Sequence, residues 1–134
     1  MIFDSSVWID YFNGKNNTHT DLLNALLESY DAVDVHFCPI IFQEVLQGIK
    51  RDEDHQQIKD LLFTCPFLYL DPYFVAEGAS TIYRSLRTKG ITIRKPNDCQ
   101  IALYAIHFKL ALVHSDKDFD KMVKHTALKV YHPK

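Results

Sequence analysis

Four acidic side chains from widely separated parts of the sequence stand where they could share one ligand: Asp4, Glu44, Asp98 and Asp116. Asp4 directly follows the apolar run MIF, and Asp116 follows the apolar stretch LALVHS. Asp98 and Glu44 lie beside apolar residues of helical patterns, and no basic residue is expected among the four. Carboxylates that meet raise one another's pKa and need a counter-charge. A hard divalent cation with oxygen ligands would supply it, which favours Mg²⁺ or Mn²⁺ over zinc.

Each of the four acids also has a purely structural interpretation. Asp98 and Asp116 could be helix caps. Asp4 could simply accept N–H bonds from the following turn, and Glu44 could be a solvated residue at the flank of its helix. These alternatives weaken when the four are taken together, because Asp and Glu are rarely buried without a partner.

The stretch HSDKDFDK, residues 114–121, adds two more acids close to Asp116. Asp118 and Asp120 are typical of the polar first turn of a helix, where carboxylates suit the helix dipole. Surface turns also collect aspartates because these cap helices, so the cluster alone is weak evidence for a metal.

Alternating apolar runs and helical patterns predict strands and helices that follow one another along the chain. The expected strands are residues 1–3, 32–38, 66–71, 110–115 and 128–132. The expected helices are residues 5–12, 18–30, 39–50, 52–63, 72–90, 96–108 and 116–123, the first of them capped by Ser5 or Ser6. This order favours an α/β fold with a central parallel sheet flanked by helices on both faces. In such sheets active residues gather beyond the carboxyl ends of the strands, where Asp4 and Asp116 would project.

Length and composition predict one globular domain over residues 1–134. The chain has 47% hydrophobic and 24% charged residues, and its formal net charge is −2. That balance gives no support to a protein held on nucleic acid by bulk charge, but it leaves room for a local basic face. No secretory signal or membrane-spanning run is expected, so we expect a cytoplasmic protein with no membrane partner. The spacing of Cys38, Cys65 and Cys99 favours buried reduced thiols.

A basic stretch without acids precedes Asp98. Between residues 80 and 97 it carries Arg84, Arg87, Lys89, Arg94 and Lys95. One interpretation is a phosphate clamp that leads to Asp98. The alternative, with equal weight, is a solvated helix end whose cations suit the dipole. Tyr83 could stack on a base or pack in the core.

Four segments of the chain resemble, in order, the motifs of the PIN-domain ribonucleases, specifically the VapC-type toxins of bacterial toxin–antitoxin pairs. The segments are FDSSVWIDYFNG, FQEVLQGI, IRKPNDCQIALYAI and LALVHSDKDFDKM. The resemblance implies that the catalytic and metal-binding acids are Asp4, Glu44, Asp98 and Asp116. It also implies that Asp118 is a candidate further ligand and that Ser5 is the hydroxyl residue beside the first acid. Asp120 has no catalytic counterpart.

The same resemblance implies metal-dependent hydrolysis of RNA by water, with Mg²⁺ as the cofactor and Mn²⁺ as a substitute. The implied substrate is structured RNA such as tRNA, and the implied partners are a small VapB-like antitoxin and a second copy in a homodimer. The alternative is a catalytically inactive PIN-like scaffold that binds RNA or a protein partner. Loss of an acid would favour that alternative, and no acid is lost. A haloacid-dehalogenase phosphatase or a response-regulator receiver fits poorly, because MIFDSS lacks the DxD or the acid pair that those proteins need.

Overall fold

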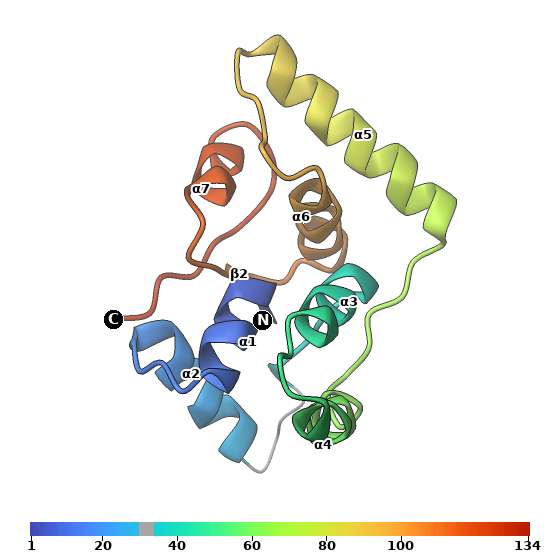
Figure 1. Ribbon diagram of the computed structural model, residues 1–134. Coiled ribbons are helices and arrows are strands. Elements are labelled where there is room, and N and C mark those ends of the chain that lie inside the picture. The colour runs from blue at the N-terminus through green and yellow to red at the C-terminus, as the bar shows by residue number, and fades with distance from the viewer. Residues whose placement is uncertain (30–33) are drawn as a thin grey trace.

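Helices make up most of the structure, a computed structural model that describes residues 1–29 and 34–134 (Figure 1). The helices are α1 (Ser5–Phe12), α2 (Thr18–Glu28), α3 (Pro39–Gln47), α4 (Asp52–Leu62), α5 (Pro72–Thr88), α6 (Asn97–Phe108) and α7 (Lys117–Val123), and the strands are β1 (Ile2–Phe3) and β2 (Leu112–Val113). Each predicted helix is present, with ends that differ by a few residues. Position 30 of the predicted helix 18–30 lies outside the described residues.

The sheet is parallel, as predicted. β1 pairs with β2, so that Ile2 lies opposite Leu112 and Phe3 lies opposite Val113. Single parallel bridges extend this pair: Ile2 with His36, Phe37 with Phe67, and Leu112 with Val130. The order across the sheet is therefore residue 67, residues 36–37, β1, β2 and residue 130, which uses all five predicted strand segments.

The predicted strands are nevertheless too long. Segments 66–71 and 128–132 form only one bridge each, at Phe67 and Val130. Positions 32 and 33 of the predicted strand 32–38 lie outside the described residues. β1 is short because the chain turns into a helix immediately after it, so the ladder has no room to grow. Apolar runs indicate where a strand is buried, but pairing along the whole run also requires a neighbour of equal length.

The core forms around the two paired strands, whose four side chains are all completely buried. Helices cover them: α1 packs against α2 and α3, α3 against α4 and α6, and α5 against α6. Figure 1 shows α5 as a long outer helix whose axis runs past α6. Among the described residues, no helix is both long enough and apolar enough to cross a membrane. Cys38, Cys65 and Cys99 are buried and free, as predicted.

Two helices begin directly at the acids that follow the strands. The Asp4 carboxylate, and not Ser5 or Ser6, is the N-cap of α1, and it accepts the N–H of Ser6. The prediction of a serine cap is wrong because β1 ends one residue earlier than a serine cap would need. Asp116 is likewise the N-cap of α7, and its Oδ1 accepts the N–H of Asp118 at 3.0 Å. Both acids are thus fixed at the same edge of the sheet.

Candidate functional site

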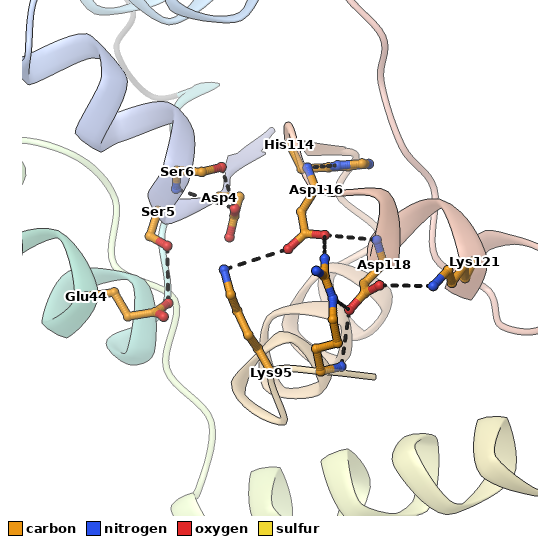
Figure 2. Close-up of polar contacts among 10 residues, drawn as sticks. Asp4, Ser5, Ser6, Glu44, Lys95, His114, Asp116, Asp118 and Lys121 are labelled. Atoms are coloured by element: carbon orange, nitrogen blue, oxygen red, sulfur yellow. Dashed lines mark hydrogen bonds and ion pairs between the residues drawn. The ribbon is translucent and has the colours of Figure 1, made fainter. Parts of the chain in front are cut away.

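One cleft, of about 610 Å³, is lined by all four of the acids singled out from the sequence. Asp4 and Asp116 reach it from the ends of neighbouring strands, while Glu44 comes from α3 and Asp98 from α6. Figure 2 shows Asp4, Ser5, Ser6 and Glu44 on one side of this region and Asp116 on the other. The topological prediction that these carboxylates lie together therefore agrees with their observed positions.

Asp98 is the acid whose negative charge is least compensated by protein groups. It lies in the first turn of α6, whose N-cap is Pro96, and its side chain makes no capping hydrogen bond within the described part of the chain, so the capping alternative is wrong for this residue. Its side chain is only 4% exposed, and its Oδ2 has no hydrogen-bond partner among the described residues. Burial, and then the charges of Asp4 and Asp116, raise the pKa of Asp98 to about 7. A buried carboxylate oxygen without a partner is costly, so this position calls for a counter-ion.

Asp4 and Glu44 are each held by a neighbouring serine. Asp4 is buried and accepts the Ser6 hydroxyl at 2.6 Å, and burial raises its pKa despite this bond. Ser5 Oγ donates to Glu44 Oε1 at 3.3 Å. Burial and the charge of Asp4 raise the pKa of Glu44. The solvated alternative for Glu44 is therefore wrong, since its side chain is half-buried beside another acid.

Asp116 is a helix cap, as the structural alternative predicts, and it also lines the cleft. Its Oδ1 caps α7 through the Asp118 N–H and also accepts Arg94 Nη2 at 3.4 Å. Its Oδ2 faces Lys95 Nζ at 3.8 Å. Capping and lining the cleft are compatible, because each uses a different oxygen of the carboxylate.

Asp118 does not line the cleft. Its side chain is 1% exposed and accepts the backbone N–H of Arg94 at 3.2 Å and its Nε at 3.3 Å. Lys121 Nζ lies 3.3 Å from its other oxygen. Burial alone would raise the pKa of Asp118, but these donors hold that pKa below its usual value. The carboxylate is already neutralised by protein groups.

The expectation that no basic residue lies among the acids is wrong. Lys95 lines the cleft between Glu44 and Asp116, as Figure 2 shows, and Arg94 lines it too. Lys95 and Arg94 precede Asp98 by three and four positions. The turn that leads into α6 therefore places them beside Asp98.

The other three predicted RNA-binding residues lie elsewhere. Arg84 and Arg87 are exposed on α5 and Lys89 is its C-cap, and none of them lines the acid cleft. The Arg87 guanidinium lies 5.9 Å from the ring centre of Tyr83, whose ring is partly buried against the core.

Sequence analysis missed two residues that contact the acids. Ser6 donates its hydroxyl to Asp4, and His114 Nδ1 accepts the N–H of Asp116 at 2.9 Å. Each of them is two positions from its acid in the sequence. Asp followed by Ser at i+2 is typical of a cap, whereas nothing in the sequence indicates that His114 faces the following backbone.

The chemistry of the cleft fits a divalent metal. Its donors are carboxylate oxygens, which Mg²⁺ and Mn²⁺ prefer, and one buried oxygen of Asp98 is unsatisfied. Within residues 1–29 and 34–134, however, no three His, Cys, Asp or Glu side chains form a group that could hold an ion as they stand. Lys95 supplies part of the missing positive charge, since it lowers the pKa of both Glu44 and Asp98 against the effect of burial.

Comparison with known proteins places this geometry in a family. The PIN domain model matches residues 1–124. The chain is 34% identical over 128 residues to VapC ribonuclease Mb1587 of Mycobacterium bovis and to ribonuclease VapC11 of Mycobacterium tuberculosis, matches that cover 96% of this chain and 95% of each relative.

Solved structures share the fold. VapBC2 from Rickettsia felis, bound to a DNA fragment from its promoter, aligns with a TM-score of 0.74 at 18% identity and covers 100% of both chains. FitAcB from Neisseria gonorrhoeae aligns with a TM-score of 0.69 at 20% identity, over 98% of this chain and 96% of that one. The chain therefore belongs to the PIN-domain family, in which it is a VapC-type protein.

Proposed function

We propose that this chain is the Mg²⁺-dependent endoribonuclease toxin of a toxin–antitoxin pair, with residues 1–134 forming one PIN domain. The observation that carries the proposal is the state of Asp98, whose buried Oδ2 lacks a partner among the described residues and whose pKa is raised to about 7. A divalent cation would satisfy that oxygen and cancel the repulsion from Asp4 and Asp116. The two mycobacterial relatives, both named as VapC ribonucleases, support RNA as the substrate.

The proposed metal ligands are Asp4, Glu44, Asp98 and Asp116, with Mn²⁺ as a substitute for Mg²⁺. When bound, such an ion supplies activation of water and stabilises negative charge on the phosphate oxygens. The protein's own contribution is orientation: Ser6 holds Asp4 and Ser5 holds Glu44 before any ligand arrives. Asp118 is left out of the ligand set because Arg94 and Lys121 already neutralise it.

The proposed RNA contacts follow from where the cations lie. Lys95 lines the acid cleft, where its ammonium contacts Asp116. The ammonium can leave Asp116 and bind an oxygen of the phosphate that is cut. Arg94 lies beside it with its side chain 72% exposed. The α5 cations would bind phosphates farther along a structured RNA such as tRNA.

We also propose that a VapB-like antitoxin covers the acid cleft. A second hollow, of about 330 Å³, adjoins the cleft and shares Ile9 and Gly48 with it. Apolar side chains of α1, α3 and α4 line it, among them Phe12, Val45 and Ile58. An apolar antitoxin segment lying there would reach the acids directly. Solved toxin–antitoxin complexes with this fold support such a partner, and a homodimer remains a prediction.

The decisive experiment compares the natural protein with Asp98→Asn, in Mg²⁺ and in EDTA. Asn keeps the shape of the side chain but removes the charge, so we expect RNA cleavage to fall roughly a hundredfold or more, as when a metal site is lost. Mg²⁺ should raise the Tm of the natural protein with concentration, because it binds only the folded state, and this rise should vanish in Asp98→Asn.

Cleavage that continues in EDTA, or that is unchanged in Asp98→Asn, would contradict the proposal. RNA binding with no cleavage by the natural protein, at any metal concentration, would instead favour the inactive scaffold.

A further inference from the structure

His114 is a buried imidazole with a hydrogen bond at each ring nitrogen. Its side chain is 3% exposed. Nδ1 accepts the backbone N–H of Asp116 at 2.9 Å, and Nε2 lies 3.1 Å from Asp120 Oδ1. A neutral imidazole carries one N–H, and the backbone donor at Nδ1 forces that hydrogen onto Nε2. His114 therefore donates to Asp120 and accepts from Asp116.

The two partners of His114 lie one helical turn apart. Asp116 is the N-cap of α7 and Asp120 belongs to its first turn, so together they hold the imidazole from both sides. The ring also packs against Phe119, with 5.1 Å between ring centres. Figure 2 shows the bond from His114 to the Asp116 backbone beside the Asp116 carboxylate.

This bond completes the restraint of Asp116. The Asp118 N–H and Arg94 hold Oδ1, while His114 holds the peptide N–H. Oδ2 is the oxygen left to face the cleft, where its contact is Lys95. If the peptide were free to turn, Oδ2 would lose its direction into the cleft, even with Oδ1 still held by the Asp118 N–H and Arg94.

We propose that His114 is a positioning residue that aims the Asp116 carboxylate into the acid cleft, and that Asp120 fixes its tautomer. This inference rests on the proposed function, because it gives Asp116 a ligand to hold. It assigns a role to Asp120, which the sequence left as a surface residue. Groups that orient a metal ligand typically contribute a factor of about 10 to 100 in metal affinity or activity.

Two amide substitutions separate the two hydrogen bonds. In His114→Asn, the amide oxygen can lie near the position of Nδ1 and still accept the Asp116 N–H, but the link to Asp120 is lost. In His114→Gln, the amide can lie near Nε2 and reach Asp120, but no acceptor remains for Asp116. Each variant loses one bond and part of the packing against Phe119. His114→Gln should lose more Tm, because it leaves the Asp116 N–H without an acceptor, whereas Asp120 is 51% exposed and can be solvated by water. Mn²⁺ affinity is therefore measured well below the Tm of both variants.

We expect His114→Gln to weaken Mn²⁺ binding, measured by calorimetry, by roughly tenfold or more, and to lower kcat for RNA cleavage with little change in KM. In His114→Asn, the Mn²⁺ affinity and kcat should stay close to those of the natural protein. Asp120→Leu should give a smaller loss, since it removes only the group that fixes the tautomer. His132→Gln is the control, because His132 lies 3.8 Å from Asp120 but does not contact Asp116.

Equal loss of Mn²⁺ affinity in folded His114→Asn and folded His114→Gln would overturn this inference alone and leave His114 as a packing residue. Natural protein that neither binds Mn²⁺ nor cuts RNA would overturn the proposed function, and this inference with it. Retention of Mn²⁺ affinity in His114→Asn but not in His114→Gln, with both variants folded at the temperature of measurement, supports positioning.

Discussion

Two groups of acids lie at the same edge of the sheet, and they differ in how well protein groups compensate their negative charge. Asp4, Glu44 and Asp98 lack sufficient counter-charge, and their pKa values are raised. At the start of α7, Asp118 is just as buried but meets Arg94 and Lys121, and its pKa is lowered. Density of acids in the sequence does not separate a metal site from a structural ion pair. What separates them here is whether protein groups satisfy the buried carboxylate: two cations reach Asp118, whereas Asp98 Oδ2 has no partner among the described residues.

The test with the largest expected effect is the pH dependence of the free energy of unfolding, measured in EDTA. Between about pH 4 and 7 the folded protein holds a proton on Asp98 that the unfolded chain has released, because burial and neighbouring acids raise the folded pKa to about 7. The folded state then binds more protons than the unfolded state, so this contribution to stability is present at low pH and lost as pH rises. Relative to Asp98→Asn, the natural protein should lose up to about 4 kcal/mol across that window.

Urea unfolding of both proteins at pH 5, 6, 7 and 8 measures this difference. The free energies of unfolding should diverge as pH rises, with Asp98→Asn the more stable at pH 8. Parallel curves would mean that Asp98 is ionised at no cost, and the contrast with Asp118 would disappear.

The second test replaces Asp118 by Asn, which should act in the opposite direction. Asn keeps the shape but removes the charge that receives two donors of Arg94 and the Lys121 ammonium, and we expect a loss of about 1–3 kcal/mol at pH 7. The exposed positions of Arg94 and Lys121 favour the lower part of that range. Because its folded pKa is lowered, the contribution of Asp118 is lost only as pH falls below about 4.

Urea unfolding at pH 7 and Mn²⁺ calorimetry on the same sample check this second prediction. Lys121→Gln is the control, and it should cost less because Arg94 remains. If Asp118→Asn kept its stability but lost Mn²⁺ affinity, Asp118 would be a metal ligand, and the two groups of acids would form one site.

The sequence predicted the position of Asp4 and Asp116 well, because the end of an apolar run marks the end of a buried parallel strand. It also predicted the order of the helices. It could not predict that Lys95 lies among the acids, since this depends on how the turn before α6 folds over the sheet edge. Nor could it predict the state of Asp98. A capping aspartate and an unsatisfied one look alike in a first helical turn, and only the path of the preceding residues separates them.

The exposed cations of α5 provide the last and smallest test, since they lie outside the acid cleft. Replacing Arg84, Arg87 and Lys89 together by Ala should weaken RNA binding and reduce the slope of log affinity against log salt by about 1.5 to 2.5, as expected for losing two or three phosphate contacts. Stabilisation by Mg²⁺ should not change, because none of the three lines the cleft.

A second triple variant, Lys124→Ala, Lys129→Ala and Lys134→Ala, removes the same charge from exposed positions near the C-terminus. Bulk attraction falls equally in both variants, so only a local phosphate contact predicts that the α5 variant loses more. Equal salt slopes would leave the α5 cations as a solvated helix end, and the RNA contacts would then be confined to Arg94 and Lys95. A steeper loss in the α5 variant would extend the RNA surface from the acid cleft onto the outer helix.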